Sequence, residues 1–211
     1  MSDIASGWSL QRDPSGWMTR WNAESARSWL AAGDWQPSTL VNVARAAVAE
    51  APERALLIDG TLTLTRAQAW DQALRLAALF LERGLVAGDV ISFQLPNWHE
   101  AAVLALAARM TGLVINPIPP IYREAELTYI LNDCGSRLLF VPGTFRKHNH
   151  KAMAEALQPS LPRLDDIVVV RDTGKLTWQD VTAGKPIAAE RLPAVDPAAV
   201  LIAMYTSGTT G

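Results

Sequence analysis

The sequence predicts an α/β protein with a doubly wound, mostly parallel sheet flanked by helices. From about residue 89 onward, short apolar runs alternate with segments of helical periodicity. These helices are long enough to act as crossovers between parallel strands. A composition of 49% hydrophobic and 19% charged residues is typical of a chain with a buried core. The rest of the sequence is consistent with this class, element by element.

Length and charge exclude several kinds of protein. A chain of 211 residues usually holds one or two domains. With 19 basic and 21 acidic residues, nothing indicates a nucleic-acid partner. The lone Cys134 excludes an internal disulfide and fits a reducing compartment. Residues 1–16 lack the apolar core of a secretory signal, and no run approaches the ~20 apolar residues of an integral membrane span. We therefore expect a cytoplasmic protein.

Residues 1–35 form a Trp-rich N-terminal extension that differs in composition from residues 36–211. It contains five of the eight tryptophans. Apolar residues recur at helical spacing in it: Trp17, Met18, Trp21, Trp29 and Leu30. This spacing predicts a helix that packs over the domain. The alternative is an interfacial helix that touches a membrane or an acyl chain, which the scarcity of basic residues disfavours.

Between residues 36 and 88 the sequence predicts two helices around a hairpin. Ser38 is expected to cap the first helix, whose apolar stripe is Leu40, Val43, Ala44, Ala47 and Val48. Apolar runs at 55–58 and 62–64 flank Asp59-Gly60, which is a strong hairpin signal. Thr65 and Gln68 fit a capping box for the second helix, which should end at Gly84.

From residue 89 the predicted order is strand, helix, strand, helix. The expected strands cover residues 89–95, 113–116, 137–141 and 167–170. The expected helices cover residues 98–110 (capped by Asn97), 123–133 and 147–157. Residues 176–181 should be peripheral, and the proline-containing segment 183–197 should lead back to the core. This alternation predicts the parallel sheet.

The last stretch of the chain is the strongest functional signal. Residues 198–204 predict a buried strand, and only Thr, Ser and Gly follow Tyr205. The loop comprises Thr206, Ser207, Gly208, Thr209, Thr210 and Gly211. Such a loop can turn several backbone N–H groups and small hydroxyls toward a phosphate chain. The alternative is an ordinary surface turn of the same composition.

Other candidate sites are weak. No glycines are spaced as Gly-x-Gly, so the dinucleotide fingerprint is missing. His148 and His150 could form a metal pair, but the basic residues around them favour a solvated turn. His99 is interpreted as a polar group at a helix start, and Cys134 as a structural cysteine whose pKa Asp133 would raise.

Tyr205-Thr-Ser-Gly-Thr-Thr-Gly211 resembles the phosphate loop of the adenylate-forming superfamily, which includes acyl-CoA synthetases and acid–thiol ligases. Further landmarks of that family occur in its order: 62–65, 88–90, 95–97, 111–112 and 116–119. Residues 123–127 look closest to the acyl-CoA synthetase branch. The match covers most of residues 36–211, which then form an incomplete N-terminal AMP-binding domain ending in the phosphate loop.

The resemblance implies an ATP- and Mg²⁺-dependent enzyme that activates a carboxylic-acid substrate as acyl-adenylate and transfers it to coenzyme A. It also implies that the 206–211 loop contacts the β- and γ-phosphates, with no catalytic or metal-binding residue assigned. The family's later motifs are not in this sequence, so the 211 residues alone are expected to be inactive. The alternative is a stand-alone, non-catalytic module that binds a partner or a nucleotide weakly. An open edge at the last strand predicts self-association.

Overall fold

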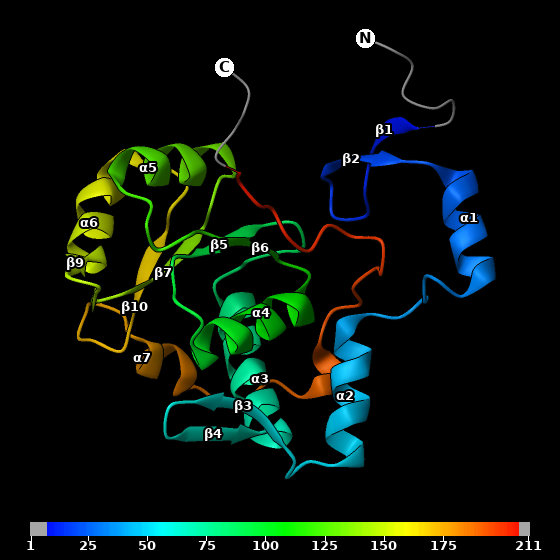
Figure 1. The fold of residues 1–211 in the computed structure, drawn as a ribbon, viewed down its shortest axis with the longest axis horizontal. Coiled ribbons are helices and arrows are strands. Elements are labelled where there is room, and N and C mark those ends of the chain that lie inside the picture. Colours follow the sequence, from blue (N-terminus) through cyan, green and yellow to red (C-terminus); the bar gives the residue numbers. More distant parts are fainter. Residues whose placement is uncertain (1–7, 207–211) are drawn as a thin grey trace.

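The computed structural model describes residues 8–206, and a four-stranded parallel sheet lies at its centre (Figure 1). The strand order is β10-β7-β5-β6. The strands are β5 (Val90–Phe93), β6 (Val114–Pro117), β7 (Leu138–Pro142) and β10 (Asp166–Val170). Their pairings are all parallel. Strand β7 is buried along its whole length, as expected for a parallel sheet covered on both faces.

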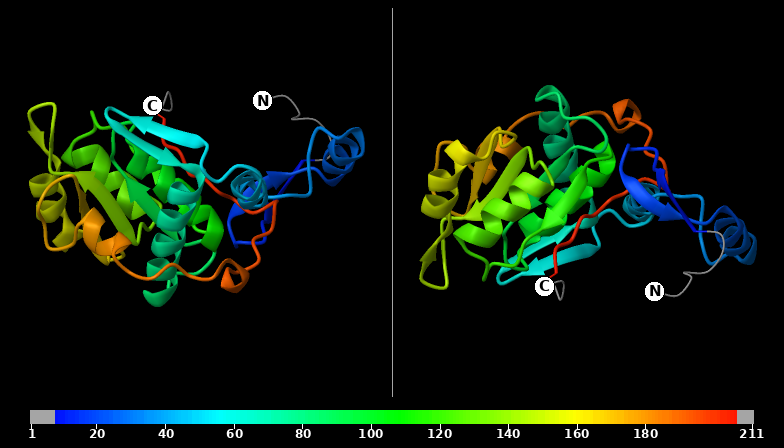
Figure 2. Two further views of the ribbon diagram at one scale, coloured as in Figure 1. Left: turned by 90° about the horizontal axis from the view of Figure 1, so that it is seen from below. Right: turned by 90° about the horizontal axis from the view of Figure 1, so that it is seen from above.

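Helices cover both faces of this sheet (Figure 2). Helices α3 (Arg66–Glu82), α4 (His99–Thr111) and α7 (Trp178–Thr182) share one apolar core with one face. Helices α5 (Glu124–Asp133) and α6 (His150–Leu157) share a second core with the other face. Alternate strand residues serve the two cores, with Phe140 in the first and Leu139 in the second. The predicted doubly wound α/β class is therefore confirmed.

The segment before the sheet contains α2 (Leu40–Glu50), β3 (Ala55–Asp59) and β4 (Leu62–Thr65). The hairpin is confirmed, with Gly60 in its turn at a φ of 61°. The capping box of Thr65 and Gln68 is also confirmed. The expected cap Ser38 is wrong by one residue, because the Thr39 side chain accepts the hydrogen bond from the Asn42 N–H. Within the predicted apolar stripe of α2, Leu40 and Val43 are exposed, whereas Ala44, Ala47 and Val48 are partly buried.

The Trp-rich segment folds differently from the prediction. Residues 17–21 belong to an antiparallel hairpin of β1 (Ser9–Arg12) and β2 (Met18–Trp21), and α1 (Ala23–Ala32) follows. The expected packing of a helix over the domain is wrong, because α1 lies to the side of the sheet (Figure 1). The tryptophans pack on one another instead: the Trp29 and Trp35 ring centroids are 4.7 Å apart, and those of Trp21 and Trp35 are 5.9 Å apart.

Three further elements differ from the prediction. Helix α4 begins after Trp98, and Asn97 does not cap it. Residues 144–149 form a small hairpin of β8 (Thr144–Phe145) and β9 (His148–Asn149), so α6 starts later than expected. Helix α7 is not peripheral, since Trp178 and Val181 are buried in the α3–α4 core. Short 3₁₀ turns occur at η1 (Gln158–Ser160) and η2 (Ala189–Arg191).

None of the helices within residues 8–206 is long and apolar enough to cross a bilayer.

Candidate phosphate-binding edge of the sheet

The segment before the predicted phosphate loop lies beside β6. The Ile115 N–H donates to the Leu201 carbonyl at 3.1 Å, and the Ala203 N–H donates to the Ile115 carbonyl at 2.9 Å. The resulting Ile115–Ile202 bridge is parallel, so the chain runs toward the carboxyl edge of the sheet. The expected buried strand is wrong in one respect. Ile202 is 43% exposed and Met204 is 69% exposed, because within residues 8–206 the segment is bridged to β6 alone.

Two side chains hold this segment in place. The Val200 N–H donates to Asp13 Oδ2 at 2.5 Å, which ties the segment to the N-terminal hairpin. The Tyr205 hydroxyl donates to Asp133 Oδ2 at 2.5 Å, and its ring meets Tyr129 edge to face. Burial, followed by the Asp133 hydrogen bond, raises the pKa of Tyr205 well above its usual range. Tyr205 therefore stays protonated and remains a donor at physiological pH.

Thr206 follows directly and lies at the carboxyl edge of the sheet. Ser207, Gly208, Thr209, Thr210 and Gly211 lie outside the described residues. In doubly wound sheets, ligands bind at this edge, near the point where the strand order reverses. Here the chain passes from β5 to β6 on one side and then to β7 on the other, so the reversal lies between β5 and β7.

A buried amide occupies that point. Gln94 follows β5 and is fully buried, and its Nε2 donates to the carbonyls of Pro119 at 3.1 Å and Tyr122 at 2.9 Å. These bonds fix the loop that leaves β6. Gln94 Oε1 has no hydrogen-bond partner in the part of the chain that the structure describes. Nothing in its sequence context singled Gln94 out, because its partners are 25 and 28 residues away.

His150 supports the same loop from α6. Its Nε2 lies 3.1 Å from the Pro120 carbonyl and its Nδ1 lies 3.2 Å from the His148 carbonyl. The solvated-turn interpretation is therefore wrong for His150, which is fully buried. The alternative metal pair is not formed either, since the His148 Nε2 faces the sulfur of Met153 at 3.3 Å. The sequence did not indicate that His150 is buried, because the basic residues of the adjacent turn favoured a solvated position.

A cluster of charged side chains links the ends of β3 and β10 with the start of α4. Arg171, just after β10, contacts Asp59 at the end of β3 and donates to Glu100 of α4 at 2.7 and 2.8 Å. Its guanidinium carbon lies 4.1 Å from the centre of the Trp98 ring. His99 begins α4 as expected, and its backbone N–H donates to Asp59 Oδ2 at 3.0 Å. That bond, together with the Arg171 contact, lowers the pKa of Asp59 to about 2.

Asp59, His99 and Glu100 bring three metal-ligating atoms within 4.8 Å of one another. Arg171 is a poor neighbour for a cation, because it already pairs with both carboxylates. The residues of this cluster therefore do not fit a Mg²⁺ site. They form a salt-bridged junction between the hairpin, α4 and β10.

Cys134 is structural, as expected. Burial is the main reason that its pKa is raised, and the charge of Asp133 adds to it. The Asn116 amide donates to Ser92 Oγ at 3.0 Å and contacts the Cys134 sulfur at 3.4 Å. The thiol is thus a packing group beside β6 and is not poised as a nucleophile.

Residues 44–211 match the protein family described as AMP-binding enzyme. The match covers most of the chain and includes the loop that the sequence singled out. This chain belongs to that family.

The relatives are ligases that are much longer than this chain. The chain is 28% identical over 207 residues to the medium-chain fatty-acid–CoA ligase of Escherichia coli K12, covering 90% of this chain and 34% of that protein. It is 29% identical to the salicyl-AMP ligase/salicyl-S-ArCP synthetase of Mycobacterium tuberculosis H37Rv, with the same coverage. The apo structure of Mycobacterium smegmatis MbtA superposes with a TM-score of 0.80 at 33% identity, covering 92% of this chain and 36% of that one. The chain thus spans about a third of the length of these relatives.

Proposed function

We propose that this chain supplies the N-terminal third and the phosphate loop of an ATP-dependent acid–CoA ligase. The observation that carries the proposal is the path of residues 201–206 along β6, which delivers Thr206 to the carboxyl edge of a doubly wound sheet. Phosphate ligands bind at that edge in this fold class. Membership of the AMP-binding family supports the same site.

The loop acts by positioning and by charge stabilisation. In the proposed reaction a carboxylate attacks the α-phosphate of ATP, giving acyl-adenylate and pyrophosphate. Backbone N–H groups and hydroxyls hold the β- and γ-phosphates, so that negative charge on their oxygens is stabilised as pyrophosphate leaves. The residues proposed for this role are Thr206, Ser207, Gly208, Thr209, Thr210 and Gly211. Mg²⁺ would supply further charge neutralisation, and no residue described here is assigned to it.

Coenzyme A is the proposed acceptor of the acyl group. The similarity to the Escherichia coli medium-chain fatty-acid–CoA ligase supports it. The mycobacterial relative is named as a salicyl-S-ArCP synthetase, so a different thiol acceptor is the competing choice. Measuring transfer to coenzyme A by an active ligase that contains this chain separates the two.

Residues 1–211 by themselves are proposed to be inactive, because they span only a third of the relatives. The test is acid-dependent ATP–pyrophosphate exchange by the purified chain, with octanoate and salicylate as acids. No exchange above the no-acid background is expected. Exchange that depends on either acid, and that remains after further purification, would contradict this point. The competing function is a stand-alone module with no catalytic role, and it predicts that the chain stays inactive even when joined to the rest of a homologous ligase.

A further inference from the structure

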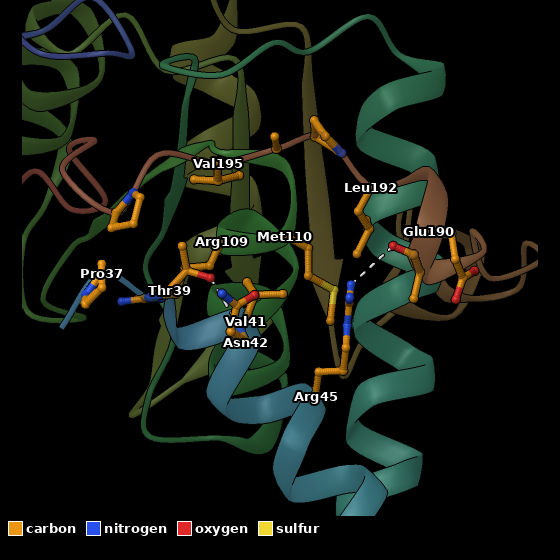
Figure 3. A pocket seen from close by; sticks show the side chains of 14 residues that line it. Pro37, Thr39, Val41, Asn42, Arg45, Arg109, Met110, Glu190, Leu192 and Val195 are labelled. Carbon is orange, nitrogen blue, oxygen red and sulfur yellow. Dashed lines mark hydrogen bonds between the residues drawn. The ribbon is translucent and has the colours of Figure 1, made fainter.

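A pocket lies away from the carboxyl edge, between α2, the end of α4 and the segment that leads back to β6 (Figure 3). It encloses about 450 Å³. Its apolar wall includes Val41, Met110, Leu192 and Val195, and its polar groups include Arg45 and Arg109 (Figure 3). The pocket therefore combines an apolar surface with two guanidinium groups.

Arg109 is the central polar group. It is half-buried in the last turn of α4, and its Nη1 donates to the Ala105 carbonyl of the same helix at 3.0 Å. No acidic side chain among residues 8–206 pairs with it. Burial lowers the pKa of its guanidinium, although an arginine remains charged at physiological pH. A cation near a helix C-terminus is favourable in itself, but that role uses one of five N–H donors.

The surroundings of Arg109 are also positive. The first turn of α2 borders the pocket through Thr39, Val41 and Asn42 and contains no acidic residue. The N-terminus of a helix carries partial positive charge, which favours an anion. Arg45, one turn further along α2, donates to the Ala189 carbonyl at 3.3 Å and keeps other donors for a ligand (Figure 3). Among the described residues that line this pocket, Glu190 is the only carboxylate, and it is exposed.

We propose that this pocket binds a small organic anion whose carboxylate or phosphate group pairs with Arg109 while its apolar body packs on Met110 and Val195. Arginine presents a planar fork that matches two oxygens of such a group. An anion with an apolar body also gains contacts with the apolar wall of the pocket. Benzoate is therefore expected to bind more tightly than inorganic phosphate or acetate. None of the described residues 198–206 lines this pocket, and the proposed binding requires no nucleotide.

The test is calorimetric titration of the 211-residue chain with benzoate, phenyl phosphate, inorganic phosphate and benzamide. Benzoate or phenyl phosphate should bind with a millimolar or lower Kd, and the neutral benzamide should bind at least tenfold more weakly. Arg109→Gln should weaken benzoate binding by about ten- to a hundredfold, the range for a charge-assisted hydrogen bond. Arg27→Gln, on the exposed face of α1, is the matched control and should bind as the unchanged chain does.

Asn42→Asp gives a second test that does not depend on the stability of the Arg109 variant. A carboxylate in the first turn stabilises a helix, so this variant should fold at least as well as the unchanged chain. Because the same charge borders the pocket, benzoate affinity should fall at least tenfold. The proposal would be overturned if the Arg109→Gln and Asn42→Asp variants both bound benzoate as tightly as the unchanged chain does. Equal binding of benzamide, tighter binding of inorganic phosphate, or no binding of any probe up to about 10 mM would also overturn it.

Discussion

Asp59 shows how contacts between distant residues set the charge state of one side chain. It accepts a hydrogen bond from the His99 backbone N–H and contacts Arg171, which lies 112 positions further along the chain. These contacts favour the ionised carboxylate, which lowers the pKa from 3.8 to about 2. Folding therefore gains stability from Asp59 at any pH above its unfolded pKa. The gain is lost as the pH falls through the folded pKa.

The Asp59→Asn variant should lose this contribution. At pH 7 we expect its free energy of unfolding to be lower by about 1–2 kcal/mol, after allowing for solvent screening of the pair. The difference from the unchanged chain should shrink as the pH falls from about 4 to about 2. Urea unfolding at several pH values measures it. A difference that stays constant over this range would show that Asp59 does not titrate in the way its contacts require.

Local signals were predictable at the scale of single residues, and long-range partners were not. The Thr65–Gln68 capping box spans three residues, so the sequence alone carries it. The His150 interaction with Pro120 spans 30 residues, and the Gln94 bonds span 25 and 28. No periodicity encodes such pairs, so a buried histidine in a basic turn was mistaken for a solvated one.

At the scale of elements, strands and helices of the sheet domain followed hydrophobic periodicity, whereas the Trp-rich segment did not. Alternation and helical spacing are ambiguous when large aromatic residues are this frequent. The tryptophans form their own cluster, so the hairpin and α1 need few contacts with the sheet. The docking of this segment depends on Asp13 and on a tight contact between Ser15, Trp17 and Gly88.

Gly88→Ala should release the N-terminal hairpin from the domain. A Cβ at Gly88 would lie 2.3 Å from the Ser15 carbonyl oxygen, and the Trp17 Nε1 donates to Gly88 at 2.9 Å. Gly84 is the matched control: its φ is also positive, at +70°, but a Cβ there meets nothing within 4 Å. Both variants pay for the strained φ, and only Gly88→Ala should also loosen the hairpin.

Limited trypsin digestion after Arg27 measures the release. The Gly88→Ala chain should be cleaved at least about tenfold faster than the Gly84→Ala chain, provided that cleavage follows the population of the open form. Equal cleavage rates would mean that the Ser15–Gly88 contact does not hold the segment in place.

At the scale of the whole molecule, the sheet has an apolar and partly open side. The 201–203 segment covers the β6 edge through a single bridge, and Ile202 and Met204 expose apolar side chains there. An edge of this kind can pair with another copy of the chain. The predicted sheet class and element order were confirmed because they depend on many residues at once. The degree of burial of residues 198–204 was not predictable, because it depends on what lies beside the strand.

Self-association of the 211-residue chain is expected for this reason. Sedimentation velocity at several concentrations should show species larger than the monomer, and deletion of residues 198–211 should reduce them. Ile202→Lys places a charge on the open edge and should have the same effect. Val86→Lys, at another exposed apolar position, is the control and should not. A chain that is monomeric at every concentration would show that the edge is protected.

The central claim is that residues 206–211 hold the phosphates of ATP during acid activation. The most direct measurement is acid-dependent ATP–pyrophosphate exchange by a chimera. In this chimera, residues 1–211 replace the matching third of the Escherichia coli medium-chain ligase. The account predicts exchange by this chimera, reduced about ten- to a hundredfold by Thr209→Ala, which removes one charge-assisted contact. Thr173→Ala, at an exposed residue after β10, should leave the rate unchanged. An inactive chimera, or unchanged exchange in Thr209→Ala, would contradict the claim.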